Sequence, residues 1–258
     1  MPHGYTGKIL HVDLGTQKTV IEEPGEAFYR SYLGGRGIGY HYLMQQVPAG
    51  TDPFAPENIL VLATGVMTGA PLPASCRFAA VGKSPLTGTA GESEAAGFFG
   101  PELKMAGFDA VVFKGKAEKP VYLWVTGGKA RIKDAAHLSD AGAHEVEDAI
   151  REEMGSKKIR VAQTGLAGMN RVRFANITNN LGHFNGRCGF GALMGSKNLR
   201  AVAALGTDKL GFQDPAFLRE TAQHYAATFK NTPAGEALYV YGTTAFPEIL
   251  SAAGALPV

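Results

Sequence analysis

Lys8-Ile-Leu-His-Val-Asp-Leu14, the turn Gly15-Thr16 and Lys18-Thr-Val-Ile-Glu22 open the chain with alternating apolar and polar residues. Such an alternation places the apolar side chains on one face of a strand, and a glycine-containing turn between two runs is typical of a β-hairpin. The sequence therefore predicts that the fold begins with a hairpin over 8–14 and 18–22.

The rest of the chain predicts a mixture of short strands and helices. Apolar runs that end in turn-forming residues predict strands at 58–63, 77–81, 109–115, 120–125, 130–132, 159–163, 172–177 and 199–205. Apolar residues at helical spacing predict helices at 26–33, 38–46, 101–106, 143–154, 215–230 and 246–253. The Gly/Ala-rich stretch 91–100 is predicted to be a loop that leads into a helix. The predicted class is α+β, with mostly antiparallel hairpins.

Glycine usage predicts two domains. The chain has 34 glycines among 258 residues, and they thin out after Gly206. We expect a domain over 1–208 and, over 209–258, the truncated start of a helical second domain, because about fifty residues are too few to hold a core alone.

Composition excludes several classes of function. The formal net charge is only +2, too small to indicate nucleic acid or a membrane surface as the partner. No run approaches the roughly 20 apolar residues of a spanning helix, and no signal peptide pattern is present, so we expect a cytoplasmic protein. Cys76 and Cys188 lie far apart and outside any Cys-x-x-Cys spacing, which predicts two reduced thiols and no cysteine-based metal site within this chain.

One glycine-rich loop invites comparison with phosphate-binding motifs. Gly186-Arg-Cys-Gly-Phe-Gly191 continues to Gly195-Ser-Lys197. A Walker A loop needs lysine before the serine or threonine, whereas here lysine follows serine. A dinucleotide loop follows a strand directly, whereas 179–185 consists mostly of polar turn formers. The loop therefore forms either simple turns or a different kind of anion site.

Basic residues accompany the glycine loops. Arg77, Arg187 and Lys197 lie in or near them, and 94–97 is a further Gly/Ala loop. A guanidinium group suits phosphate oxygens or the face of a flat ring, and glycine lets backbone N–H groups approach the same ligand. The pattern predicts one large, anionic ligand that contains rings.

A series of blocks carries a family resemblance. They are Gly4-Tyr-Thr-Gly7-Lys8, Tyr32-Leu-Gly-Gly-Arg-Gly37, Asp52-Pro-Phe-Ala-Pro-Glu-Asn58, Ala63-Thr-Gly65, Thr68-Gly69, Lys83-Ser-Pro-Leu-Thr-Gly88, Phe99-Gly-Pro-Glu-Leu-Lys104, Ala106-Gly-Phe-Asp109, Lys114-Gly-Lys-Ala-Glu-Lys-Pro120, Asn185-Gly-Arg-Cys-Gly-Phe-Gly191 and Met194-Gly-Ser-Lys-Asn-Leu199. In this order they resemble the aldehyde:ferredoxin oxidoreductase family, nearly continuously from residue 4 to about 206. The tail resembles the beginning of that family's second domain.

The resemblance implies a fold and a cofactor. Family members hold tungsten, or sometimes molybdenum, between two pyranopterins, with a magnesium ion that joins the pterin phosphates and a nearby 4Fe-4S cluster. The implied first domain is a β-rich saddle of two sheets with flanking helices, followed here by an incomplete helical segment. The implied cofactor-binding residues are Arg77, Glu94, Ala95, Ala96, Gly97, His183, Phe184, Asn185, Gly186 and Arg187. The backbone carbonyls of Glu94 and Phe184 fall where the family binds magnesium.

The same loops depart from the pattern of the aldehyde enzymes. Ser93-Glu-Ala-Ala-Gly97 stands where we expect Ala-Asn-Ser-Gly-Gly, and Gly182-His-Phe-Asn-Gly-Arg187 stands where we expect His-Arg-Ala-Ala-Gly-Arg. A change of side chain leaves the backbone carbonyls able to bind magnesium, whereas the Glu94 side chain brings a negative charge close to the phosphates. The departures predict a divergent subgroup and leave acyl or aromatic carboxyl chemistry open beside aldehyde oxidation. His183 is either a donor to a pterin or a solvent-facing structural residue.

The four cluster cysteines and the family's acid/base residues belong to later domains, so we predict no catalytic residue here. The first hypothesis is a cofactor-binding portion, inactive alone, of an enzyme that oxidises aldehydes, or reduces the acid or acyl level, with ferredoxin. Its partners would be the missing C-terminal domains. The alternative is a standalone or split-gene pterin-binding scaffold that meets a separate catalytic subunit. We also expect a homodimer, because the open side of the saddle would expose an apolar patch.

Overall fold

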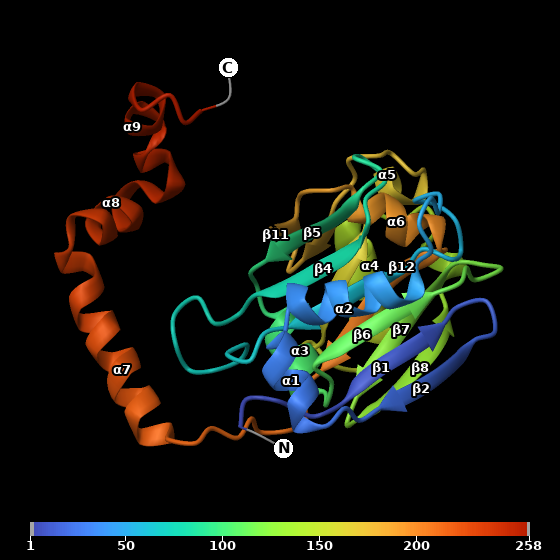
Figure 1. Ribbon diagram of the computed structural model, residues 1–258, viewed down its shortest axis with the longest axis horizontal. Coiled ribbons are helices and arrows are strands. Elements are labelled where there is room, and N and C mark those ends of the chain that lie inside the picture. The colour runs from blue at the N-terminus through green and yellow to red at the C-terminus, as the bar shows by residue number, and fades with distance from the viewer. Residues whose placement is uncertain (1–2, 257–258) are drawn as a thin grey trace. The chain divides into compact units, whose positions relative to one another are not determined.

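Two six-stranded mixed sheets form the body of the molecule, as the computed structural model of residues 3–256 shows (Figure 1). The strands of the first sheet are β1 (Ile9–Asp13), β2 (Lys18–Glu22), β3 (Leu60–Thr64), β4 (Phe78–Lys83), β5 (Ala90–Ala95) and β6 (Ala110–Lys114). Those of the second are β7 (Val121–Thr126), β8 (Lys129–Asp134), β9 (Arg160–Thr164), β10 (Ile177–Asn179), β11 (His183–Asn185) and β12 (Leu199–Leu205).

The second sheet repeats the topology of the first. The first has the order β2-β1-β6-β3-β4-β5, and the second, read from its opposite edge, has the order β8-β7-β12-β9-β10-β11. In each sheet one inner pair is parallel, β1 with β6 and β7 with β12, and the other pairs are antiparallel. Each sheet therefore ends on a corresponding edge strand, β5 or β11.

The alternation of side chains along the strands builds three layers of core. Leu60 and Leu62 of β3 enter the core between the two sheets, whereas Val61 and Ala63 enter the core on the outer face. In the second sheet β7 behaves likewise, since Val121, Leu123 and Val125 face the first sheet while Tyr122 and Trp124 face outward. Both faces of the central strands are therefore buried, which explains their nearly continuous apolar sequence.

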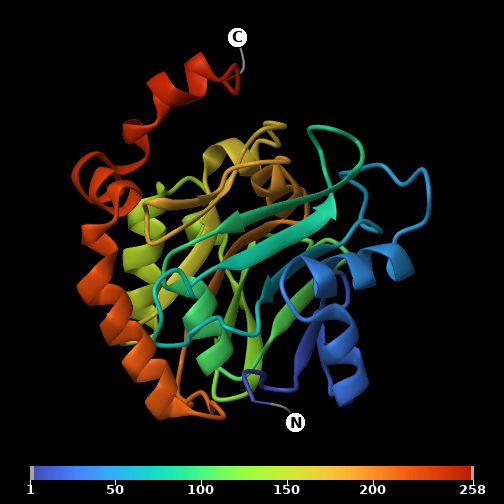
Figure 2. The ribbon, with the colours of Figure 1, turned by 60° about the vertical axis from the view of Figure 1, so that its left-hand side comes forward.

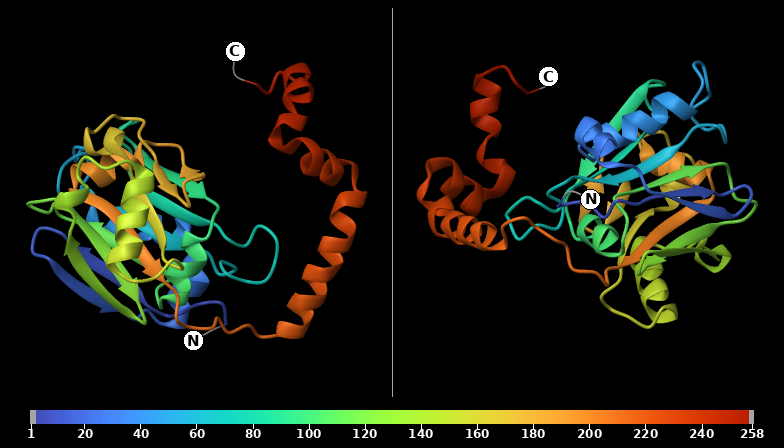
Figure 3. Two further views of the ribbon diagram at one scale, coloured as in Figure 1. Left: turned by 180° about the vertical axis from the view of Figure 1, so that it is seen from behind. Right: turned by 60° about the horizontal axis from the view of Figure 1, so that its bottom comes forward.

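Helices cover the outer faces of both sheets, and two further helices, which begin at Phe99 and Phe190, pack into the core between the sheets. The helices of residues 3–206 are α1 (Glu26–Tyr32), α2 (Arg36–Gln46), α3 (Phe99–Met105), α4 (Ala143–Glu153), α5 (Leu166–Met169) and α6 (Phe190–Ser196), with a 3₁₀ turn η1 (Ala136–Leu138). In Figure 2, α1 and α2 (blue) lie beside the first sheet, and in the view from behind in Figure 3, α4 (yellow-green) comes to the front. Phe99 of α3 and Phe190 of α6 are fully buried in the core between the sheets.

The α+β class and the two sheets with flanking helices are confirmed. Two details of the sequence prediction are wrong. Part of the loop predicted over 91–100 is strand β5, and the strand predicted over 172–177 is instead a turn that leads into β10. The pairing is mostly antiparallel, as predicted, and the exceptions are β1 with β6 and β7 with β12. The sequence does not predict β5 as a strand, because Glu92, Ser93 and Glu94 interrupt any apolar run. Charged residues of this kind are common on the edge strand of a sheet.

The chain folds into two compact units, residues up to 70 with 74–213, and 71–73 with residues from 214 onward. The second unit holds α7 (Pro215–Thr228), η2 (Phe229–Asn231), α8 (Pro233–Tyr241), η3 (Gly242–Ala245) and α9 (Pro247–Ala252). A side chain caps the N-terminus of α7 and of α8: Asp214 accepts from the Phe217 N–H, and Thr232 accepts from the Gly235 N–H. The predicted domains, 1–208 and 209–258, stay a prediction. Within residues 3–256, no helix is long and apolar enough to cross a bilayer.

Candidate functional site

The two loops that the sequence singled out meet at the paired edges of the sheets. The Asn179 amide donates to the Ala96 carbonyl at 3.0 Å, and the Asn185 amide donates to the Ser93 carbonyl at 2.8 Å. The Arg187 N–H also donates to the Ser93 hydroxyl at 3.1 Å. Since 93–97 includes the end of β5 and 183–187 includes β11, the repeated topology brings 94–97 and 183–187 side by side.

Gly97 packs closely against Asn179 of β10 and His183 of β11. Its φ of +100° favours glycine, and a Cβ at this position would overlap the side chain of Asn179. The Phe98 N–H, next in the chain, donates to the Asn180 side chain at 2.7 Å. A glycine is therefore required here by backbone conformation and by space.

The predicted residues divide into a buried frame and an exposed surface. Ala95, Gly97 and Asn185 are buried and Ala96 is half-buried. The exposed residues are Arg77, Glu94, His183, Phe184, Gly186 and Arg187. The frame fixes the backbone, while arginine, histidine and aromatic side chains remain accessible to a ligand.

Arg77 joins this surface through a cavity of about 280 Å³ that it lines together with Glu94. Gly35 and Gly65 lie in the wall of the same cavity, where they leave room that side chains would fill. The structure thus brings Arg77, which immediately precedes β4, close to Glu94 near the end of β5, and Glu94 belongs both to the cavity wall and to the loop 94–97.

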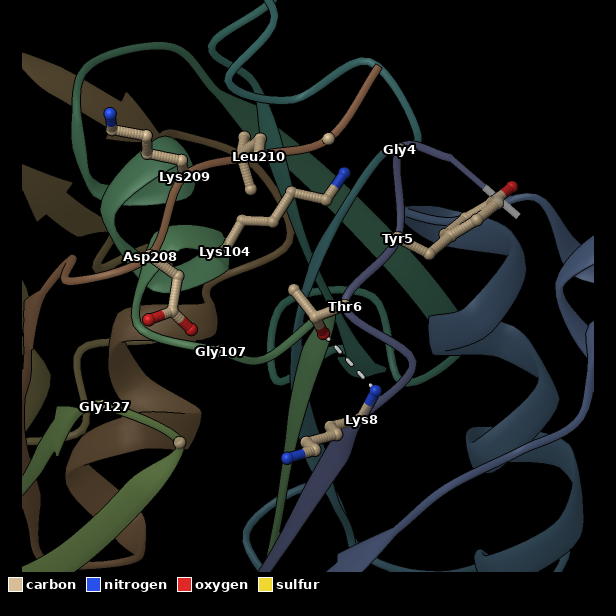
Figure 4. A pocket seen from close by; sticks show the side chains of 12 residues that line it. Gly4, Tyr5, Thr6, Lys8, Lys104, Gly107, Gly127, Asp208, Lys209 and Leu210 are labelled. Atoms are coloured by element: carbon tan, nitrogen blue, oxygen red, sulfur yellow. Dashed lines mark hydrogen bonds between the residues drawn. The ribbon is translucent and has the colours of Figure 1, made fainter. Parts of the chain in front are cut away.

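A second cavity, of about 230 Å³, lies at the opposite end of α3 (Figure 4). Lys104 lines it and is almost fully buried, and its ammonium group donates to the carbonyls of Gly65 at 2.6 Å and Val66 at 3.0 Å. Burial lowers the pKa of Lys104 to about 8, although the Asp109 carboxylate opposes this shift. Because Gly65 and Val66 line the first cavity, Lys104 holds part of the wall of that cavity in place.

Lys197, which the sequence grouped with Arg77 and Arg187, has a different place. It is buried, and its ammonium group donates to the carbonyls of Pro56, Asn58 and Gly115. Burial lowers the pKa of Lys197 to about 8. Lys197 therefore joins loops within the core and does not belong to the exposed surface.

Arg36 is a charged neighbour of the site that the sequence prediction missed. Its guanidinium lies 2.6 Å from a carboxylate oxygen of Glu92 and 3.9 Å from one of Glu94. The Gly-Gly-Arg-Gly corner at 34–37 is visible in the sequence, whereas its contact with β5 joins residues 56 apart and follows from tertiary packing.

Several features fit a large cofactor with phosphates and rings. The guanidinium groups of Arg77 and Arg187 are exposed, which suits phosphate oxygens. Within residues 3–256, the buried side-chain oxygens of Asn179 and Asn185 have no hydrogen-bond partner, and such oxygens can accept from ring N–H groups. The same residues include no cluster of three or more His, Cys, Asp or Glu side chains that could hold a metal ion.

The N-terminal domain of aldehyde ferredoxin oxidoreductase, as a family model, matches residues 9–206. The chain belongs to the aldehyde ferredoxin oxidoreductase family. The resemblance inferred from the sequence blocks is thereby confirmed.

Curated relatives in this family are longer than the chain. Tungsten-containing aldehyde ferredoxin oxidoreductases of Pyrococcus abyssi and Pyrococcus furiosus are 41% and 39% identical to it, over 98% and 99% of the chain. The match spans 42% of each of these proteins, about two fifths of their length. The WOR-like subunit of an aliphatic sulfonate oxidoreductase from Pyrococcus furiosus is 35% identical over 81% of the chain.

A solved structure supports the fold. The active site complex BamBC of benzoyl coenzyme A reductase, bound to 1,5-dienoyl-CoA, superposes with a TM-score of 0.85 and 35% identity. The match covers 90% of this chain and 35% of the solved chain. The chain thus resembles proteins whose names point to different substrates, an aldehyde, a sulfonate and an acyl-CoA.

Proposed function

We propose that 94–97 and 183–187, together with Arg77, bind a tungsten or molybdenum bis-pyranopterin. One observation carries the proposal: the two loops occupy equivalent positions in two sheets of equal topology, and hydrogen bonds from Asn179 and Asn185 hold them side by side. A cofactor made of two similar halves suits two equivalent loops. The tungsten in the names of the curated relatives supports the metal assignment.

The exposed groups have distinct roles in this proposal. Arg77 contacts one pterin, and Arg187 contacts the other or its phosphate through its planar N–H groups. His183 donates to a pterin from the exposed end of β11, and the backbone carbonyls of Glu94 and Phe184 bind magnesium. When bound, the metal supplies two-electron chemistry at a carbonyl-level substrate. This chain orients the cofactor and provides no catalytic residue.

In the complete enzyme we propose oxidation of an aldehyde, or reduction at the acid or acyl level, with ferredoxin as the electron partner. A 4Fe-4S cluster held by further domains or by a separate catalytic subunit would carry the electrons. The chain alone would then be inactive, because it supplies half of the cofactor's surroundings. We place the protein in the cytoplasm and expect the exposed Phe98 and Phe184 to favour a homodimer when no other domain covers them.

Acyl chemistry is a second candidate for the substrate. The acyl-CoA reductase complex matches the chain at 35% identity, close to the 38–41% of the aldehyde enzymes. The loop 93–97 also departs from the pattern expected of aldehyde enzymes. Activity of the complete enzyme with an aldehyde and with an aromatic acyl-CoA would separate the two candidates.

Metal and pterin analysis tests the proposal. The chain would be expressed with tungstate and molybdate and purified without oxygen, then analysed for metal by mass spectrometry and for pterin by fluorescence after acid oxidation. Metal and pterin in constant ratio to the chain would support cofactor binding, and would keep a scaffold role open. A folded chain without either would contradict binding by these loops alone.

A further inference from the structure

Arg36 bridges two carboxylates at the edge of the candidate site. It is the first residue of α2, and it contacts Glu92 and Glu94, which lie two residues apart on β5. We propose that Arg36 is a positioning residue of the cofactor site: it neutralises Glu94 and so allows an anionic cofactor to bind beside β5. This inference rests on the proposed function.

The register of the sheet explains why both glutamates face Arg36. Glu92 pairs with Val81 and Glu94 pairs with Ala79 on β4. Val81 and Ala79 belong to the core beneath α1 and α2, so the two carboxylates emerge on the same side as α2. Ser93 points the other way and accepts from the Arg187 N–H.

The backbone before α2 holds Arg36 in place. Gly34 and Gly35 have φ values of +140° and +51°, and the Gly35 N–H donates to the Thr64 carbonyl at 2.9 Å. In the first turns of the helix, a Cβ on Gly39 would overlap the Val81 side chain. These glycines let α2 begin directly against the sheet, so that Arg36 reaches the edge strand.

The ion pair of Arg36 with Glu94 changes the charge that an anionic ligand would meet. Glu94 lines the cavity that contains Arg77, so its carboxylate would repel phosphate groups bound there. Arg36 offsets that charge, while 62% of its side chain stays exposed and can face the same anion. The glutamate that departs from the expected family pattern thus has a counter-charge from another element.

A purely structural ion pair would behave differently. The side chains of Glu92 and Glu94 are 27% and 39% exposed and that of Arg36 is 62% exposed, and pairs of this kind contribute little to stability. Loss of the Arg36 charge should therefore lower the amount of cofactor per chain more than it lowers the stability of the fold. Because the coupling acts through Glu94, removal of the Glu94 charge should make Arg36 less important.

A double-mutant cycle tests the proposal on the whole chain loaded with tungstate in the expression host. The variants are R36Q, E94Q and R36Q/E94Q, with R30Q as a matched control, because Arg30 forms an exposed pair with Glu26 on α1. We expect R36Q to lower tungsten and pterin per chain about threefold or more, and the same change in the E94Q background to lower them much less. The midpoint of thermal unfolding of the cofactor-free chain should stay close to that of R30Q.

Four results would overturn the inference. If the wild type is loaded and R36Q is loaded equally well, or loses cofactor equally in both backgrounds, Arg36 does not act through Glu94. If R36Q unfolds at a much lower temperature than R30Q, its role is structural. A wild type with neither tungsten nor pterin would overturn the proposed function together with this inference. A loaded wild type with any of the other results would overturn only the inference about Arg36.

Discussion

Asn185 donates from its side-chain amide to the backbone carbonyl of Ser93 at 2.8 Å and thereby joins the edge strands of two separate sheets. Asn185 is fully buried, so this bond is shielded from water. It links the middle of 183–187 to the residue just before 94–97. The integrity of the site therefore depends on a residue that the sequence indicated only as a cofactor contact.

Replacement of Asn185 by alanine should leave the Ser93 carbonyl without its donor. We expect Asn185→Ala to lower the free energy of unfolding by about 1–3 kcal/mol, the usual cost of a buried group left unpaired. Denaturant titration would measure the loss, with Thr16→Ala in the exposed hairpin turn as the control. Equal stability of the two variants would show that the bond between the sheets contributes nothing.

Gly97 and Gly88 form a matched pair of left-handed glycines. Gly97 has φ of +100° and no room for a Cβ, whereas Gly88 has φ of +72° and open space around it. We expect Gly88→Ala to cost about 1 kcal/mol through backbone conformation alone. Gly97→Ala should cost clearly more and should also reduce tungsten content, since it pushes Asn179 away. Similar costs by denaturant titration would contradict the tight approach of the loops.

The buried ammonium of Lys104 predicts a dependence of stability on pH. The pKa of Lys104 is about 8 in the folded protein and 10.5 ordinarily, because burial disfavours the charge. Between these values the unfolded chain binds more protons than the folded one, so the free energy of unfolding should rise as pH rises from 8 towards 10. Lys197 contributes in the same direction.

Lys104→Met should remove the part of this slope that belongs to Lys104, up to about 1.4 kcal/mol per pH unit. Urea titrations from pH 7 to 10 would measure it, with exposed Lys157→Met as the control. Above pH 10 the opposite effect sets in, because burial raises the pKa of Tyr29 and Tyr42. A slope unchanged in Lys104→Met would contradict the buried charge.

Arg77 and Arg187 should matter for loading and little for folding, because both are exposed. We expect Arg77→Gln and Arg187→Gln each to lower tungsten and pterin per chain, while circular dichroism and thermal unfolding stay unchanged. Arg131→Gln, at an exposed position of β8, is the control. Loading that falls equally in all three variants would indicate a general effect of charge.

The strands of the core could be predicted because both of their faces are buried. Leu60 to Ala63 supply apolar side chains to two cores, which leaves a continuous apolar run in the sequence. The edge strands could not be predicted in the same way. His183, Phe184 and Asn185 form β11 without any alternation, since tertiary pairing with β10 determines their conformation.

The sequence also did not predict the repeated sheet topology, because the two sheets share their strand order and have little visible sequence likeness. Phe99-Gly100 at the start of α3 and Phe190-Gly191 at the start of α6 are a short visible likeness, and both phenylalanines are buried in the core between the sheets. The meeting of the two loops follows from strand order, which periodicity does not encode. The glycines and arginines were apparent, whereas their convergence needed the three-dimensional fold.

Hydrogen–deuterium exchange with mass spectrometry, on the loaded and the cofactor-free chain, tests most directly whether the paired loops hold the cofactor. The account predicts slower exchange on loading in the peptides that cover 94–97 and 183–187, both together. Slower exchange confined to other regions, such as residues 4–8 and 208–211 around the Lys104 cavity, or no change at 94–97 and 183–187, would contradict it.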